Sequence, residues 1–167
     1  DLGDLSDADA AATLISNADT AMYEAKKSGR ARVVLFTSQM RSAARERTEL
    51  AAALAHAVAE RRVDVDYQPV FSAIDNTIVG AEALVRWNHP TRGRIDPAMF
   101  VSIAEESGAI GRLGELVLGR AMADAQRWIE QGRAGRSFAV HVNVSHMQLA
   151  SASFVNLVLA LLRQHRL

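Results

Sequence analysis

A glutamate at position 82 is the first residue whose surroundings indicate chemistry. It lies within the run 79–87, where alternate side chains of a strand would point to opposite faces. One face is apolar and the other carries both charges: Ala81, Ala83, Val85 and Trp87 against Gly80, Glu82, Leu84 and Arg86. A carboxylate buried in such a run is costly unless it meets a cation or hydrogen-bond donors. We therefore expect Glu82 to contact a metal ion or an arginine, unless this face of a hairpin is turned to solvent.

Arg86 cannot be that partner within one strand, because four residues at about 3.3 Å each separate the two side chains by roughly 13 Å. A ligand could span this gap. A second polar stripe follows in 140–145, where valines alternate with His141, Asn143 and Ser145. Polar groups facing inward are typical of a functional barrel strand, although an ordinary amphipathic strand facing water has the same pattern. Gln68, at the end of the preceding apolar run, is by itself an ordinary surface amide.

The composition limits the classes of partner. The chain has 167 residues, 49% of them hydrophobic, and 19 basic residues balance 19 acidic ones. Such a balance favours a folded protein and argues against a nucleic acid polymer as partner, so an anionic ligand must be bound locally. The absence of cysteine excludes disulfides and thiolate metal sites and favours a cytoplasmic location. There is no membrane segment, since no run approaches the roughly 20 apolar residues needed, and both ends of the sequence look cut.

In the first half of the chain, the sequence predicts a helix over 9–27 that begins with a capping box at Ser6 and Asp9. Gly29 follows as a left-handed cap, and the short apolar run 33–36 predicts a buried strand. A charged helix over 39–62 then leads into two strands, 63–71 and 78–87, which the turn-prone residues 75–77 would join as an antiparallel pair.

The remaining sequence predicts three helices and one strand. Asp96 and Pro97 begin a helix that ends near Gly108. A longer helix follows over 110–131, then a strand over 138–145 and a final helix from Phe154 to Leu162. This order predicts an α/β fold with a parallel sheet beyond the opening hairpin. The 119 residues from 49 to 167 are about half of the roughly 250 that a closed eight-fold barrel takes.

Several stretches taken together resemble the EAL domain family, in the family's order and spacing. A lone Glu-Ala-Leu triplet would mean little, but the resemblance covers about residues 49–167. The matching stretches are 67–70, 80–90, 93–100, 104–108, 142–145 and 148–149. The fold implied is a truncated TIM-like (β/α) barrel with an antiparallel first strand.

The opening resembles a different family, because residues 17–30 are similar to the closing helix of GGDEF domains. This match covers about the first 37 residues and implies that Lys26 and Arg30 contact phosphate. The signature loop of that family is absent, so diguanylate cyclase activity cannot reside in this chain. The predicted organisation is a GGDEF tail (1–38), a helical linker (39–62) and the N-terminal half of an EAL domain (63–167).

The EAL resemblance implies a protein that hydrolyses cyclic di-GMP to linear pGpG with two Mg²⁺ or Mn²⁺ ions. Glu82 and Asn143 would be metal ligands. Gln68 would bind a guanine, Leu84 would line the dinucleotide groove and Arg86 would bind a phosphate oxygen. The resemblance also implies a longer homodimeric protein with an upstream sensory or GGDEF domain, through which it could be anchored to a membrane.

The departures from the EAL and GGDEF patterns are modest and remove no named ligand: Val85, His141, Val144 and Ala31. The EAL family's remaining acidic ligands and its catalytic lysine would follow Leu167, so we expect the 167-residue chain to be inactive and the longer protein to be the enzyme. Two alternatives stay open. The longer protein could be a non-catalytic cyclic di-GMP receptor or interaction module with a degenerate EAL domain, or the chain could be a truncated gene product without function.

Overall fold

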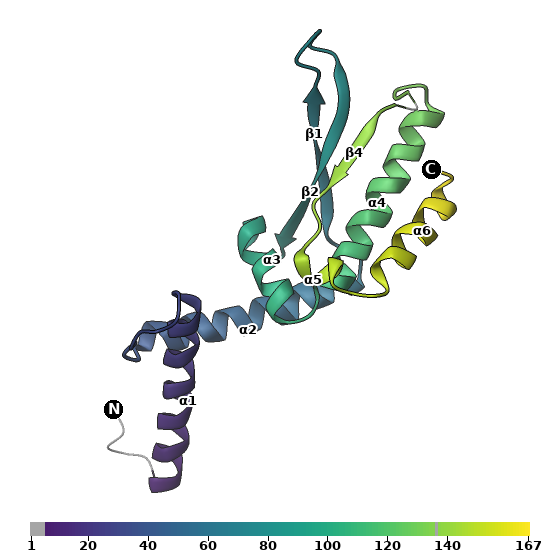
Figure 1. Ribbon diagram of the computed structural model, residues 1–167. Coiled ribbons are helices and arrows are strands. Elements are labelled where there is room, and N and C mark those ends of the chain that lie inside the picture. Colours follow the sequence, from purple (N-terminus) through teal and green to yellow (C-terminus); the bar gives the residue numbers. More distant parts are fainter. Residues whose placement is uncertain (1–5, 136) are drawn as a thin grey trace. The chain divides into compact units, whose positions relative to one another are not determined.

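The computed structural model describes residues 6–135 and 137–167, and the chain divides into two units at residues 50 and 51. Residues 1–5 of the predicted segment 1–38 lie outside the described residues. The first unit contains α1 (Asp7–Lys27) and the beginning of α2 (Ser38–Ala59) (Figure 1). Helix α1 begins as predicted, because the side chain of Ser6 accepts a hydrogen bond from the backbone of Asp9.

The strand predicted over 33–36 is wrong. These residues have no regular secondary structure, and Val33 and Leu35 are 92% and 82% exposed. Val34 and Phe36, which alternate with them, are less exposed. Val34, Leu35 and Phe36 line a hollow of about 550 Å³ against Met22 and other residues of α1. Exposure along 33–36 therefore alternates as it would in a strand. The described part of the first unit, however, contains no second strand whose backbone could hydrogen-bond to this run.

The second unit is built on an open four-stranded sheet (Figure 1). Strands β1 (Asp64–Phe71) and β2 (Ile78–His89) are antiparallel, as predicted, and β4 (Ala139–Val142) runs parallel to β2 on its other side. A short strand that the sequence did not predict, β3 (Gly93–Ile95), pairs with the end of β2. The predicted hairpin and parallel sheet are thus confirmed, and within the described residues the sheet does not close into a barrel.

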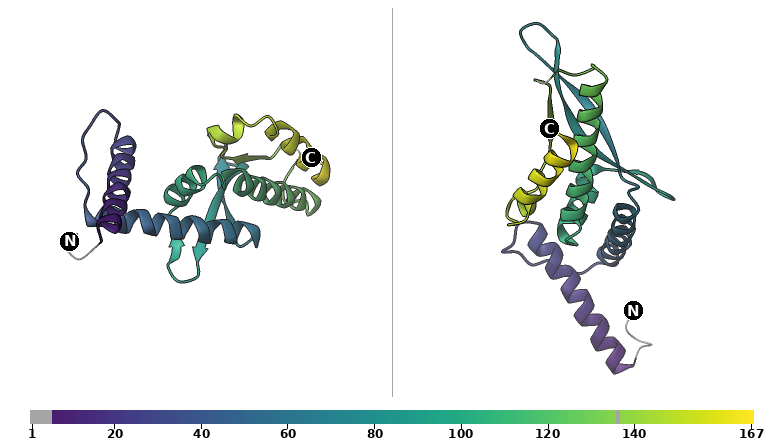
Figure 2. Two further views of the ribbon diagram at one scale, coloured as in Figure 1. Left: turned by 90° about the horizontal axis from the view of Figure 1, so that it is seen from below. Right: turned by 90° about the vertical axis from the view of Figure 1, so that its right-hand side faces the viewer.

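Four helices follow in the second unit: α3 (Pro97–Glu106), α4 (Ile110–Glu130), α5 (His146–Leu149) and α6 (Phe154–His165). Helix α3 begins as predicted, since Asp96 accepts a hydrogen bond from the backbone of Ala98 at 3.0 Å. Figure 2 shows α4 and α6 running side by side. The largest fully buried side chains come from α2, α3, β2 and the segment before β1: Trp87, Phe100, Leu54, Ile103 and Val63.

Helix α4 is fastened to β1 by an aromatic contact and a hydrogen bond. The hydroxyl of Tyr67 donates to Asp124 Oδ2 at 2.6 Å, and its ring meets Trp128 edge-on with centroids 4.7 Å apart. Burial, with the Asp124 bond, raises the pKa of Tyr67, so the hydroxyl stays a donor at neutral pH. Since Tyr67 faces α4, its strand neighbours Asp66 and Gln68 face the opposite side of the sheet.

Candidate functional site

One face of the sheet carries the residues that the sequence singled out on β1 and β2. Glu82 of β2 lies directly opposite Gln68 of β1 and opposite His141 of β4. Residues paired across neighbouring strands share a face, and every second residue along β2 returns to it. Glu82, Leu84 and Arg86 therefore share one face, as the alternation predicted, and the strand pairing adds Gln68 to it.

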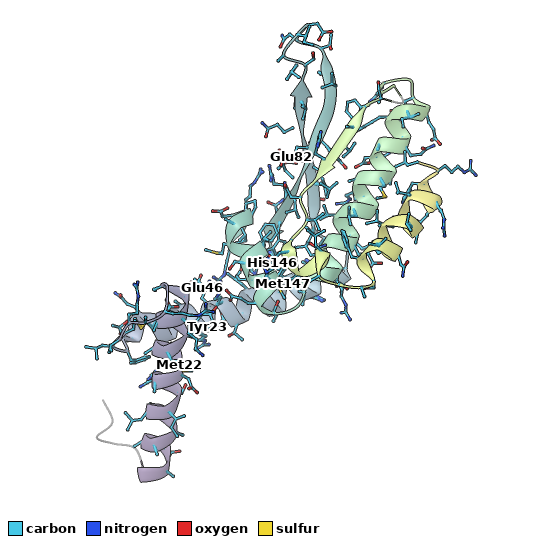
Figure 3. All side chains as sticks on the ribbon, viewed as in Figure 1. Met22, Tyr23, Glu46, Glu82, His146 and Met147 are labelled. Atoms are coloured by element: carbon cyan, nitrogen blue, oxygen red, sulfur yellow. The ribbon has the colours of Figure 1, made fainter. Side chains whose placement is uncertain are left out.

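The contact that joins two strands at this face is between Asn143 and Glu82. Asn143 Nδ2 donates a hydrogen bond to Glu82 Oε1 at 2.7 Å, although the two residues are 61 positions apart in the sequence. Figure 3 places Glu82 part-way along β2. Strand β4 ends at Val142, three residues earlier than predicted, so Asn143 is the first residue beyond the strand. The partner of Glu82 is thus an amide from the parallel neighbour and not an arginine.

Arg86 has a different carboxylate as its partner. Arg86 Nε donates to Asp66 Oδ2 at 2.8 Å, and Nη1 donates to the carbonyl of Val85 at 2.9 Å. Arg94 of β3 reaches the same Asp66 oxygen at 3.1 Å. The Arg86 side chain is only 18% exposed, whereas Asp66 is 55% exposed. The guanidinium of Arg86 is therefore held in place on the site face, and any anionic ligand must compete with Asp66 for it.

The sequence reasoning missed Asp66, Arg94 and Gln148. The signal for Asp66 was its position two residues before Gln68, which places both on one face of β1. Gln148, in α5, lines a cavity of about 350 Å³ together with Leu84, Arg86, Asn143 and apolar residues of α3 and α4. The middle of β2 and the end of β4 thus border a partly apolar cavity beside Asn143.

The Glu82–Asn143 pair fits a hard divalent cation as part of a larger ligand set. A carboxylate and an amide oxygen are ligands that Mg²⁺ and Mn²⁺ prefer, and Asn143 would offer its Oδ1. The described residues contain no group of three or more His, Cys, Asp or Glu side chains that could hold a metal ion. Two oxygen donors are fewer than the six that Mg²⁺ takes, so the pair is an incomplete site.

Lys26 and Arg30 belong to the first unit. Lys26 is exposed in the last turn of α1, and Arg30 is exposed beyond it with φ 59. Their role in binding phosphate stays a prediction. Within 6–135 and 137–167, every helix is too short or too polar to cross a membrane.

Comparison with known proteins identifies relatives of most of the chain. The EAL domain family model matches residues 51–167. An uncharacterized signaling protein of Caulobacter vibrioides is 44% identical over 148 residues, which is 89% of this chain and 18% of the relative. The bifunctional diguanylate cyclase/cyclic di-GMP phosphodiesterase MucR of Pseudomonas aeruginosa is 39% identical over 154 residues, which is 92% of this chain and 22% of the relative.

A solved structure has the same arrangement of elements. The PaMucR phosphodiesterase, determined as a complex with c-di-GMP, matches with a TM-score of 0.67 and 35% sequence identity. The match covers 71% of this chain and 47% of the solved chain. The present chain therefore spans less than half of that structure and about a fifth of the curated relatives it matches.

Proposed function

The chain belongs to the EAL domain family, and we propose from this premise that it forms the first half of a cyclic di-GMP phosphodiesterase domain in a longer protein. That longer protein is called the complete protein below. The observation that carries the proposal is the 2.7 Å contact of Asn143 with Glu82, which brings two oxygen-bearing side chains from neighbouring strands to one point. The similarity to a phosphodiesterase solved with c-di-GMP supports the choice of substrate.

The proposed reaction is hydrolysis of one phosphodiester bond of cyclic di-GMP to give linear pGpG. Two Mg²⁺ or Mn²⁺ ions, when bound, supply an activated water for in-line attack on phosphorus. Glu82 contributes a carboxylate oxygen and Asn143 its amide oxygen as direct ligands. Residues beyond this chain complete the ligand set and provide the base.

The neighbouring side chains are assigned to the substrate. Arg86 binds a phosphate oxygen, since a guanidinium forms charge-assisted hydrogen bonds with phosphate and this one lies on the same face as Glu82. Leu84, between them on β2, lines the groove for the dinucleotide. Gln68 is exposed opposite Glu82 and hydrogen-bonds a guanine edge.

The first unit is proposed to be the tail of a GGDEF domain, followed by the linker helix that leads into the EAL domain. The alignment with the bifunctional MucR relative supports this, because it covers 92% of the chain and so extends beyond residues 51–167. In this assignment Lys26 and Arg30 contact phosphate in the GGDEF domain.

Replacement of the metal ligands in the complete protein tests the proposal. Glu82→Ala and Asn143→Ala are each expected to abolish Mn²⁺-dependent formation of pGpG, because each removes a direct ligand. Glu115→Ala, an exposed acidic residue of α4, is the control and should leave turnover unchanged. Turnover of Glu82→Ala within a few-fold of the unmodified protein would disprove the assignment. Binding of cyclic di-GMP without any turnover by the unmodified protein would instead favour the receptor function.

A further inference from the structure

Gln148 has no role in the proposed reaction, yet it is the one buried polar or charged side chain among the described residues, at 6% exposure. It lies in the single-turn helix α5, which follows β4 and packs against α4. Figure 3 labels its neighbours His146 and Met147 at this turn. A buried amide is costly unless its hydrogen bonds are satisfied, so its partners indicate what it does.

The side chain and the backbone N–H of Gln148 both bond to Ser145. Gln148 Oε1 accepts a hydrogen bond from the backbone N–H of Ser145 at 3.1 Å, and the backbone N–H of Gln148 donates to Ser145 Oγ at 3.3 Å. These reciprocal bonds form a capping box, so they fix the conformation of Ser145 relative to α5. Ser145 is two residues after Asn143, and residues 143–145 have no regular secondary structure of their own.

The other side of the Gln148 amide lies against α4. A Cβ atom added at Gly114 would come within 1.8 Å of Gln148 Nε2 and 2.7 Å of its Cδ. Only a glycine therefore leaves room for this side chain at its present position. The amide is held between a bare stretch of helix backbone on one side and the Ser145 backbone on the other.

We propose that Gln148 is a positioning residue that holds the 143–145 segment so that the Asn143 amide meets Glu82. The segment leaves β4 at Val142 and is fixed at two points, the Asn143 contact with Glu82 and the Ser145 bond to Gln148. Because the Gln148 side chain packs against α4 at Gly114, it holds this segment in a fixed position relative to α4. The absence of a side chain at Gly114 leaves room for the Gln148 amide. The inference rests on the proposed function of Glu82 and Asn143 as metal ligands.

The test measures Mn²⁺ binding to the complete protein by electron paramagnetic resonance of free Mn²⁺, beside thermal unfolding by circular dichroism. Gln148→Ala is expected to weaken Mn²⁺ binding about 10-fold, the lower end of what loss of a group that orients a ligand costs. Gln148→Glu keeps an oxygen acceptor for Ser145 and should retain most of the affinity. Gln164→Ala, an exposed glutamine of α6, is the matched control.

Gly114 offers an independent route to the same side chain. Gly114→Ala should weaken Mn²⁺ binding by displacing Gln148, but should add nothing when Gln148 is already alanine. Gly111→Ala is the control on the same helix, because a Cβ there meets no atom within 4 Å. Non-additivity of the Gly114 and Gln148 substitutions would identify the steric contact as the cause.

The outcomes separate the inference from the proposed function. Mn²⁺ affinity of Gln148→Ala equal to that of the unmodified protein, with only a lower melting temperature, would overturn the positioning role and leave Gln148 a structural residue. If Gln148→Ala does not fold, unchanged Mn²⁺ affinity in Gly114→Ala would overturn it in the same way. If Glu82→Ala does not reduce Mn²⁺ binding, it is the proposed metal function that fails.

Discussion

We expect Asp66 to limit how readily Arg86 binds the phosphate of the proposed substrate. Its Oδ2 accepts from Arg86 and Arg94, so one carboxylate partly neutralises two guanidinium groups on the face that carries Glu82. The arrangement has two opposite effects. It orients Arg86 before a ligand arrives, and it competes with the ligand for the same donors. Because Asp66 is 55% exposed, solvent screens this competition and its energy is small.

Removal of the Asp66 charge is predicted to strengthen binding. Asp66→Asn in the complete protein should tighten the binding of cyclic di-GMP by about 0.2–1 kcal/mol, the range expected for an exposed ion pair. Isothermal titration in Ca²⁺, which should permit binding without turnover, measures the change. Glu115→Gln on α4 is the control for a general effect of charge. Weaker binding by Asp66→Asn would mean that orientation of Arg86 outweighs competition.

Removal of the Arg86 guanidinium is predicted to have the opposite effect on binding. Arg86→Ala should weaken cyclic di-GMP binding by about 1.5–3 kcal/mol, the value of a lost hydrogen bond between charged groups. The same titration in Ca²⁺ applies, and the expected effect is on the dissociation constant more than on turnover of bound substrate. An unchanged dissociation constant would remove Arg86 from the site and leave its ion pair with Asp66 as a structural contact.

Side-chain alternation predicted much of the site at the scale of residues. It placed Glu82, Leu84 and Arg86 on one face, because the period of two is a property of the strand alone. The partners of these residues were harder to predict, since Asp66 reaches Arg86 only through the β1–β2 register. Gln148 could have been found from Ser145 three residues earlier, which is the sequence pattern of a capping box.

At the scale of elements, long periodic segments were predicted well, whereas two of the short ones, β3 and α5, were missed. Helix α4 and strand β2 have enough residues to display a period, and their predicted bounds agree with the structure to within two residues. Strand β3 has three residues and α5 has four, too few for a period to be recognised. The strand predicted over 33–36 is wrong for a different reason. Exposure alternates along this run as in a strand, but no strand in the described residues of its unit pairs with it.

The attachment of α4 to β1 leads to a stability prediction. Tyr67→Phe in the complete protein removes the bond to Asp124 and should lower the free energy of unfolding by about 1.5–3 kcal/mol, since the acceptor is charged and its side chain is only 15% exposed. Urea unfolding followed by circular dichroism measures this. The ring contact with Trp128 is kept, so the loss should belong to the hydroxyl alone. In an Asp124→Ala background the same substitution should cost little, and an equal cost there would contradict the pairing.

At the scale of the whole molecule, the proposed function assigns this chain only part of a two-ion site. Glu82 and Asn143 are the two ligands assigned, and the described residues contain no group of three or more His, Cys, Asp or Glu side chains that could hold a metal ion. We therefore predict that the purified 167-residue chain does not hydrolyse cyclic di-GMP in Mn²⁺. Chromatographic detection of pGpG is the measurement. Its Mn²⁺-dependent formation by this chain, absent in Glu82→Ala, would contradict the prediction.

An apolar groove distinguishes the C-terminal part of the second unit. It has a volume of about 670 Å³ and is bounded by α4, β4 and α6 with largely apolar side chains, among them Phe138, Val142 and Leu162. Helix α6 has no buried residue, although Phe154 and Val158 line the same groove. Strand β4 pairs with β2 on one side, and no described strand pairs with its other edge. An apolar groove beside an unpaired strand edge favours association between chains.

The last prediction concerns the behaviour of the 167-residue chain in solution. We expect it to aggregate or to lack fixed tertiary packing, because the groove and the β4 edge expose apolar surface that a folded domain covers. Helices such as α4 can form locally, so far-ultraviolet dichroism alone does not test this. Near-ultraviolet dichroism from Trp87 and Trp128 should be weak and urea unfolding broad. A sharp two-state transition from a monomer, measured by sedimentation, would mean that the open sheet with its helices is stable by itself.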